Sequence, residues 1–248
     1  MSQPVQSLEL PWSKRVPVLA LAGTSITYCL VVIWYVATFP DIGLRCLLPN
    51  KEGGESLTVT QFVFSDDDCL SMAVRPGDKL LAANRKPADN FFRLMAVLAE
   101  LRNAPIPPGG QLNPGSDPSE PPRSQVPALV EIARDDGTAT RRYVELSIRK
   151  PDVPGLAIHT YVALKPLGAG DFLLTISWFV CQLGILVVAL AVWWQRPSDT
   201  VVRLFCVMCS LAMPAFVGGF HWWILVANPL LNLPFIFAGC LLLSLIHI

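Results

Sequence analysis

Charged residues are scarce in this sequence, and their signs cancel. Only 15% of the 248 residues are charged, with 19 Lys and Arg against 19 Asp and Glu. Soluble domains usually carry about 25% charged residues. No cluster of Lys and Arg is present, which argues against a nucleic acid as a partner. Since 52% of the residues are hydrophobic, the composition indicates that the lipid bilayer is a partner of this chain.

Motifs for catalysis are also missing. The three histidines, His159, His221 and His247, are scattered, and none belongs to the His-Glu-x-x-His motif of a zinc protease. No Gly-x-Ser-x-Gly sequence of a serine hydrolase occurs either. We therefore expect no enzyme activity, no metal and no cofactor in this chain. His221, which lies beside two tryptophans, is expected to be a solvated group at a membrane interface.

Most of the seven cysteines lie in apolar stretches, where cysteine packs as a small hydrophobic residue. Cys206 and Cys209 have the spacing of a metal or redox pair, but no second pair and no nearby His accompany them. We predict that they only pack. Cys46 and Cys69 lie in the more polar part of the chain and could form a disulfide in an oxidising compartment, a question that the sequence leaves open.

Three long stretches contain no Asp, Glu, Lys or Arg: residues 16–39, 172–194 and 204–248. A helix that crosses the hydrocarbon core needs about 20 apolar residues. The last stretch is long enough for two crossings. The predicted fold class is therefore a helical membrane protein of about four spans, at 16–39, 172–194, 201–220 and 230–248, joined to a separate domain between the first two spans.

The basic residues suggest an orientation. Lys14 and Arg15 precede the first span, and Arg196 follows the second after the interfacial pair Trp193-Trp194. Lys and Arg are enriched in cytoplasmic loops. We expect residues 1–15 in the cytoplasm and the inserted domain outside it, in a multi-pass protein of the bacterial inner (plasma) membrane. A cleaved signal peptide is the alternative, but small residues come too early in the apolar run to mark a cleavage site.

The inserted domain, 41–150, shows strand patterns at its beginning. Residues 57–64 alternate between apolar and polar, as a half-buried strand does. The three acids at 66–68 are expected to form a solvated turn, since contiguous carboxylates cannot all face one cation. Pro76-Gly77 predicts a tight turn into which Asp78 hydrogen-bonds, followed by a buried strand at 80–83 and a reversal that begins at Asn84.

A helix and two strands complete the predicted domain. Residues 90–101 have one apolar face, formed by Phe91, Leu94, Met95, Leu98 and Leu101. Residues 128–133 predict a strand that enters a hairpin at Asp136-Gly137, and 142–148 predict the returning strand. Between them, 105–127 is rich in Pro, Gly and Ser and is expected to be a disordered insertion. The Pro- and Gly-rich residues 151–170 are expected to be a linker to the second span.

This order of elements, with Pro76-Gly77-Asp78 and Asn84 as its structural motif, resembles a bacterial PDZ domain, a small antiparallel β-barrel or sandwich with helices. The resemblance implies an α/β PDZ-like fold that binds a peptide as an added strand beside the helix. The carboxylate-binding loop of such domains would correspond to Ile42-Gly43-Leu44, with Phe91 and Met95 across the groove. The segment before the Pro-Gly-Asp turn departs from the family pattern. The alternative is a PDZ-like domain that only packs or forms a homodimer.

The helical region resembles the input region of bacterial multi-span signalling proteins that carry GAF, histidine kinase or phosphatase modules. This resemblance rests on Arg196-Pro197-Ser198-Asp199 and on 202–209. It implies a sensor whose outer domain recognises a peptide or protein and whose output domain lies elsewhere. Residues 243–248 resemble the translation of a sequencing adapter, so we expect a truncated reading frame. The alternative function is an adaptor or protease-associated subunit without a catalytic site of its own.

Overall fold

The computed structural model describes residues 12–45, 48–49, 56–107, 111–112, 127–133, 140–153 and 155–247. The chain divides into a helical unit, Met1–Ala37 with Gly168–Ile248, and a sheet unit, Thr38–Leu167. The two units are described in turn.

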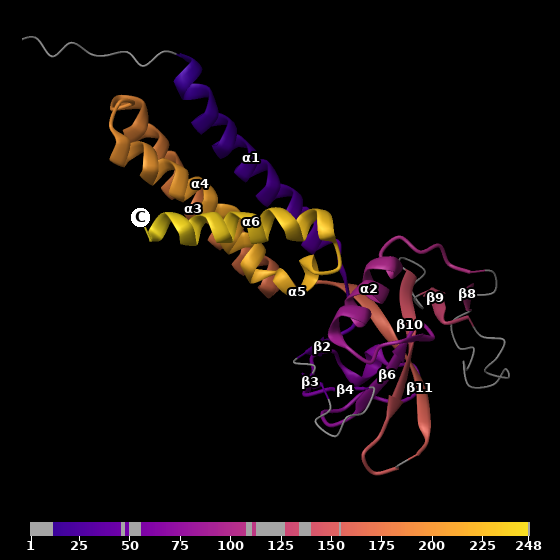
Figure 1. Ribbon diagram of the computed structural model, residues 1–248. Helices are drawn as coiled ribbons and strands as arrows, with labels where there is room; N and C mark the ends of the chain where they lie inside the picture. Colours follow the sequence, from indigo (N-terminus) through magenta and orange to yellow (C-terminus); the bar gives the residue numbers. More distant parts are fainter. Residues whose placement is uncertain are drawn as a thin grey trace, which may run out of the picture. The chain divides into compact units, whose positions relative to one another are not determined.

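The helical unit contains four long helices and one short one (Figure 1). All four long helices have the length and the apolar composition to cross a membrane, as the sequence predicted. Their ends differ from the predicted ones by a few residues. The helices are α1 (Trp12–Ala37), α3 (Ala169–Gln195), α4 (Thr200–Phe220), α5 (Trp222–Leu225) and α6 (Pro229–Ile246).

Helix α4 lies at the centre of this unit and packs against α1, α3 and α6. Accordingly, 44% of its membrane-spanning window is buried, against 6% for α6. Gly218 is where α4 approaches α6, because a Cβ atom at this position would lie only 2.7 Å from the ring of Phe235. Close helix contacts in membranes commonly depend on such small residues.

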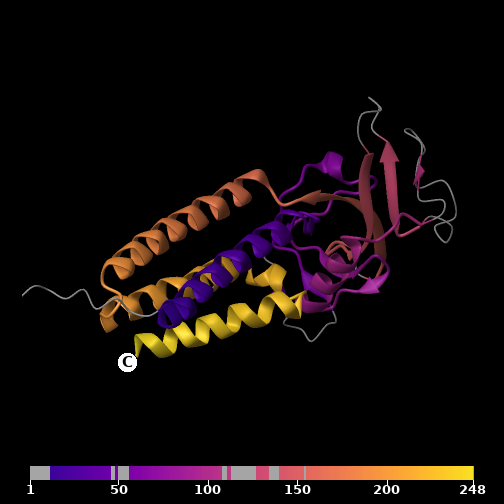
Figure 2. The same ribbon diagram turned by 90° about the horizontal axis from the view of Figure 1, so that it is seen from above.

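The beginning of α1 and the end of α3 lie at the same end of the helical unit. The rings of Trp12 and Trp194 meet edge to face at 6.1 Å, and the guanidinium of Arg15 lies 4.9 Å from the Trp194 ring. The predicted Trp193-Trp194 pair is divided, since Trp193 is fully buried and Trp194 is exposed. Helices α1 and α3 are therefore antiparallel, as Figure 2 also shows.

The sheet unit is a curled, mainly antiparallel sheet in the order β1-β11-β10-β6-β4-β3, with β9 beside β10. Strands β2 and β5 form a separate pair. The elements are β1 (Pro40–Asp41), β2 (Leu44–Arg45), β3 (Leu48–Pro49), β4 (Leu57–Thr58), β5 (Gln61–Phe62), a 3-10 turn (Asp66–Asp68), β6 (Lys79–Ala83), β7 (Lys86–Pro87), α2 (Phe91–Leu101), β8 (Gln111–Leu112), β9 (Leu129–Ala133), β10 (Thr140–Arg149) and β11 (Ala157–Pro166).

The predicted strand at 57–64 is two short strands instead of one. Between β4 and β5 the backbone of Val59 turns toward the Pro-Gly-Asp turn: its N–H donates to Asp78 O (2.8 Å), and its carbonyl accepts from Gly77 N (2.7 Å). Strand β4 then pairs with β3 and β6, whereas β5 pairs with β2. The alternating pattern predicted the extended backbone but not this change of partner.

The segment 151–170, predicted as a linker, contains the ten-residue strand β11. It pairs with β10 from Arg142↔Leu164 to Arg149↔Ala157, and with β1 at its other edge. Residues 160–163 are buried one after another, which explains the lack of an alternating pattern. The prolines and glycines that suggested a linker lie at the two ends of the strand. The domain therefore extends to Leu167.

Other predicted elements are confirmed. Asn90 caps α2 by accepting from Arg93 N (2.9 Å), and the helix buries the face that its spacing predicted, except that Phe91 is only half-buried. Strands β9 and β10 pair antiparallel, as expected of a hairpin. The Asp136-Gly137 turn and most of the predicted insertion at 105–127 lie outside the described residues.

Candidate functional site

The residues predicted to bind a peptide lie near one another in the sheet unit. Ile42-Gly43-Leu44 connects β1 to β2, and α2, which carries Phe91 and Met95, packs against β1. Gly43 has a φ of +72°, and a Cβ atom here would lie 2.6 Å from the ring of Phe64. Only glycine satisfies both conditions, so the conformation of the loop is fixed.

The side chains of these residues are mostly covered. Ile42, Leu44 and Met95 are buried in the core. Phe91 is half-buried, and its ring meets that of Phe92 edge to face at 6.1 Å. Phe92 is 61% exposed. The exposed apolar surface at the start of α2 is thus provided by Phe92, a residue that the helical spacing assigned to the solvent side.

A buried carboxylate occupies the loop. Gly43 N donates to Asp41 Oδ1 (2.9 Å), and the Arg45 guanidinium donates to both carboxylate oxygens, Nη1 to Oδ1 at 2.8 Å and Nη2 to Oδ2 at 2.5 Å. Asp41 is only 7% exposed. This paired arrangement is the strong, two-pronged form of an arginine–carboxylate interaction. An Asp and an Arg four residues apart are a signal for this pair in the sequence, but the pair was not predicted.

Strand β2 has one paired edge. Gly43 O accepts from Val63 N (2.9 Å), on the side of β5. Successive residues of a strand direct their backbone groups to opposite sides, so those of Leu44 point away from β5. There, among the described residues, the Leu44 carbonyl accepts a long bond (3.3 Å) from the side chain of Arg45. Among the described residues β2 pairs with no second strand. We call the backbone N–H and C=O groups of Leu44 the β2 edge.

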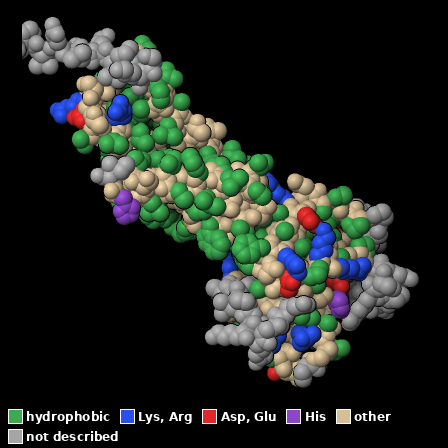
Figure 3. Space-filling model, in the orientation of Figure 1, with side chains coloured by type: hydrophobic (Ala, Val, Ile, Leu, Met, Phe, Trp, Pro, Cys, Tyr) green, Lys and Arg blue, Asp and Glu red, His purple; other side chains and the backbone are tan. Residues whose placement is uncertain are grey.

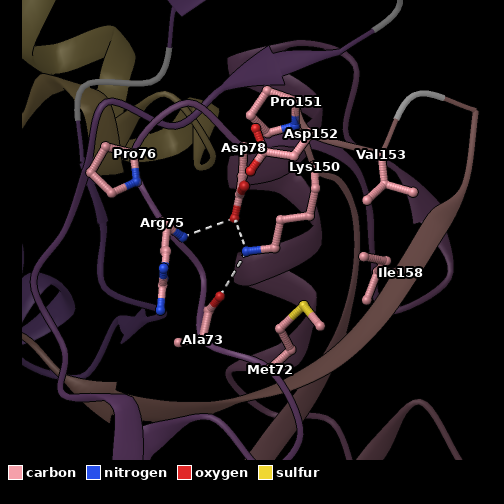
Figure 4. Close-up of a pocket in the computed structure, with 10 residues that line it drawn as sticks. All are labelled: Met72, Ala73, Arg75, Pro76, Asp78, Lys150, Pro151, Asp152, Val153 and Ile158. Carbon is pink, nitrogen blue, oxygen red and sulfur yellow. Dashed lines mark hydrogen bonds and ion pairs between the residues drawn. The ribbon is translucent and has the colours of Figure 1, made fainter.

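The Pro-Gly-Asp motif forms the turn that the sequence predicted. Gly77 has a φ of +94°. Asp78 Oδ2 accepts from Arg75 N (2.8 Å), as expected, and also from Lys150 Nζ (2.8 Å), which donates in addition to Ala73 O (2.9 Å). Figure 4 shows this network at the centre of a pocket of about 400 Å³.

The buried ion pair explains why the turn carries an acid. Asp78 is 1% exposed, and its bond to Lys150 joins the turn before β6 to the residue after β10. The apolar pocket wall consists of Met72, Val153 and Ile158. The predicted reversal after β6 is also present, since Asn84 and Arg85 both have positive φ angles, as the central residues of a type I′ turn do.

A second polar cluster lies on one face of β10 and β11. Glu145 Oε1 is 2.7 Å from His159 Nδ1, Ser147 Oγ is 3.2 Å from the same nitrogen, and Arg85 Nε donates to Glu145 Oε2 (2.8 Å). In a Ser-His-acid triad the serine and the acid contact different ring nitrogens. Here both approach Nδ1, so the geometry is that of a structural cluster.

The prediction that the acids at 66–68 form a solvated turn is wrong for Asp68. Its carboxylate is buried and accepts from Lys165 Nζ (2.6 Å) and Ser65 Oγ (3.0 Å). Burial by itself would raise the pKa of Asp68, but the hydrogen bonds and the charge of Lys165, with help from Ser65, outweigh it and lower the pKa. Because β11 was predicted as a linker, the partner Lys165 was not foreseen.

His221 is also placed differently from the prediction. It is 1% exposed, so it is not a solvated interfacial group. Its Nε2 lies 2.7 Å from Thr175 Oγ1, which joins the end of α4 to α3. The ring of Phe220 meets the imidazole edge to face at 4.9 Å.

The cysteines show no sign of a site. Cys206 and Cys209 are buried in α4, which agrees with packing. Cys69 is a free thiol, and Cys46, its predicted partner, lies outside the described residues. Burial, the larger effect, together with nearby acids raises the pKa of the Cys69 thiol. No group of three or more His, Cys, Asp or Glu side chains that could hold a metal occurs in the described part of the chain.

The chain was compared with known proteins. No protein-family model, no curated protein and no solved structure matches it.

Proposed function

We propose that this chain is the membrane-bound recognition module of a bacterial signal-transduction protein, and that its PDZ-like sheet unit binds an extended peptide or protein segment outside the cytoplasm. The β2 edge is the observation that carries the proposal. A strand that pairs on one side only, as β2 does among the described residues, can accept a further strand through backbone hydrogen bonds.

The surroundings of the β2 edge favour a peptide as its ligand. The side chains of Ile42 and Leu44 are buried, so a bound segment would meet the backbone of Leu44 directly. Helix α2, which packs against β1, carries the exposed ring of Phe92, which contacts that of Phe91 and offers an apolar surface. The backbone would supply affinity for extended segments in general, and Phe92 would select an apolar residue among them.

The helical unit supports the membrane assignment and the proposed orientation. Its surface is mainly apolar, with charged side chains gathered at one end (Figure 3). The aromatic and basic cluster of Trp12, Arg15 and Trp194 resembles the interfacial anchor of a cytoplasmic face. The end of α1 and the beginning of α3 lie at the other end of these helices from this cluster. An inserted domain outside the cytoplasm agrees with this arrangement.

A binding experiment tests the recognition role. The full-length chain, purified in detergent, would be screened against a random heptapeptide library, and the best binder would then be N-methylated at one residue after another. Addition to the β2 edge predicts that methylation at alternate residues abolishes binding, because only these donate to the strand. If the loss of binding does not alternate along the methylated peptide, or if no peptide binds, the proposal is contradicted.

A side-chain variant tests the apolar contact. Phe92→Ser should weaken the same peptide roughly tenfold, since burying an aromatic ring contributes about 1.5 kcal/mol or more. Met72→Ser is the matched control, because Met72 is also an exposed apolar side chain but lies in the pocket beside Asp78. Equal effects of both substitutions would argue against a site at α2.

Labelling of intact cells tests the orientation. Met72→Cys should react with a membrane-impermeant maleimide, whereas Ser198→Cys, between α3 and α4, should react only after the cells are opened. The unmodified chain measures the background from native cysteines. The reverse pattern would refute the proposed topology.

A further inference from the structure

We propose that one end of the helical unit, formed by the start of α1, the end of α3 and the start of α4, binds the headgroup of an anionic phospholipid, and that Arg15 contacts the phosphate. The inference goes beyond the proposed function and does not depend on peptide recognition. It depends on the four helices that are long and apolar enough to cross a membrane.

The side chain of Arg15 is held by aromatic rings and has no counter-ion among the described residues. Its guanidinium carbon lies 4.9 Å from the centre of the Trp194 ring and 5.9 Å from that of Trp12. Its Nε is buried and has no hydrogen-bond partner. A cation that has lost water in this way is stabilised by an anion, and the planar fork of an arginine fits the oxygens of a phosphate.

Two further arginines give this end an excess of positive charge. Arg196 ends α3 and Arg203 lies near the start of α4, and both are exposed. The acid beside them, Asp199, caps α4 by accepting from Val201 N (2.9 Å) and Val202 N (3.4 Å). It forms no ion pair with either arginine in the described part of the chain. The positive charges at this end are therefore available to attract an anion.

The surroundings of Arg15 favour a lipid as the source of the phosphate. Trp12 is 67% exposed and Trp194 48%, and exposed indole rings lie at the headgroup level of a bilayer. Val16 and Val192, close by on α1 and α3, are exposed and apolar, so acyl chains could pack against them. Basic side chains between helices at this depth can bind anionic headgroups.

Native mass spectrometry tests the proposal by counting bound lipids. The full-length chain, purified in dodecyl maltoside, would be incubated with equal amounts of phosphatidylglycerol and phosphatidylcholine that have the same acyl chains. It should bind the anionic lipid about tenfold more tightly, a difference of about 1.4 kcal/mol. Equal binding of the two lipids would overturn the proposal.

Variants of single arginines test the placement of the site. Arg15→Gln should abolish the preference for phosphatidylglycerol, whereas Arg196→Gln and Arg203→Gln should each reduce it by about threefold, the effect of an exposed charge. Arg149→Gln is the matched control, because it removes the same charge from an exposed position of the sheet unit. A preference that survives Arg15→Gln, or that falls equally in Arg149→Gln, would overturn the site.

Two further measurements cover loss of folding and a different source of phosphate. Should Arg15→Gln fail to fold, Arg15→Lys keeps the cation but lacks the planar fork, so the preference should still fall. An unchanged preference in Arg15→Lys would refute the contact with the fork. Inorganic phosphate at constant ionic strength should not displace the lipid, because it has no acyl chains. Displacement would assign the site to free phosphate and overturn a lipid as its ligand.

Discussion

The two units of this chain stabilise their buried polar groups in opposite ways. Among the described residues of the sheet unit the buried charged side chains are four carboxylates, and each has a cationic partner: Asp41 with Arg45, Asp68 with Lys165, Asp78 with Lys150, and Glu145 with Arg85. In the helical unit the buried polar side chains are neutral hydroxyls and one histidine: Ser25, Thr175, Ser210 and His221.

The partners also come from different places. Three of the four acids in the sheet unit pair with residues 60 to 97 positions away, so these ion pairs join parts of the chain that are distant in sequence. In the helical unit Ser210 donates to Cys206 O (2.8 Å), one turn back in its own helix. Helices in lipid satisfy their backbone internally and tolerate few charges. Long-range charge pairs therefore organise one unit, and close helix packing organises the other.

The largest effect is expected where a long-range pair is broken. Asp78→Ala leaves the largely buried Lys150 without its counter-ion and should destabilise the sheet unit by about 3–5 kcal/mol. Hydrogen exchange of the β6 and β10 amides measures this loss. The matched control is Glu100→Gln in the exposed Lys86–Glu100 pair, which should change stability by about 1 kcal/mol or less.

The tryptophans make this test specific to one unit. All seven lie outside residues 38–167, so their fluorescence reports on the helical unit alone. Asp78→Ala should leave the fluorescence unfolding midpoint in detergent unchanged. A midpoint that falls together with amide protection would mean that the two units unfold as one, and the comparison between them would not hold.

The next largest effect is expected in helix packing. Gly218→Ala places a methyl group against Phe235 and should destabilise the helical unit by about 1–3 kcal/mol, the usual range for overpacking. Gly239→Ala is the control: it gains the same helix propensity, but a Cβ atom at this position would lie within 4 Å of no other atom. The difference between the two midpoints, measured by tryptophan fluorescence, isolates the contact. Equal midpoints would show that α4 and α6 separate easily at this point.

The sequence predicted the helical unit better than the sheet unit, because the helical unit depends more on local patterns and the sheet unit more on long-range contacts. An apolar span is a local pattern, so four spans could be located from composition alone. Strand β11 was missed because its four successive buried residues are covered on both faces, which removes the alternation that identifies a half-buried strand.

The candidate site was predicted only in part. The turns at Gly77 and Asn84 could be identified because a positive φ favours Gly and Asn, whereas Gly43 was chosen through the resemblance to a family. The pairing of Asp78 with Lys150, and that of Asp68 with Lys165, depends on contacts across the sheet that no local pattern encodes. His221 was predicted as solvated because its contact with Thr175 of α3 is a tertiary contact as well.

A smaller effect is expected for the polar contact between helices. Thr175→Val removes the bond to His221 and should destabilise the helical unit by about 0.6 kcal/mol, and by at most about 1.7 kcal/mol. Ser177→Ala is the control, because the Ser177 hydroxyl donates to Leu173 O in its own turn. Fluorescence midpoints in detergent give both values. A loss above about 1.7 kcal/mol, the upper end for polar contacts between helices in membranes, would indicate that His221 does more than join α3 to α4.

The smallest effect is a dependence on pH that should be confined to the sheet unit. The pKa of Asp68 is lowered from its ordinary value of 3.8, because Lys165 and Ser65 outweigh the opposing effect of burial. A carboxylate whose pKa is lower in the folded state stabilises the fold above its unfolded pKa, and the stabilisation is lost as pH falls through the folded value. Amide protection in β11 should therefore decline below about pH 4. Lys165→Gln should flatten this decline, since it removes the main group that lowers the pKa.

Tryptophan fluorescence of the helical unit should not change in step with β11, because its buried polar groups include no carboxylate among the described residues. A parallel decline in both signals would show that acid acts on the whole chain and not through Asp68.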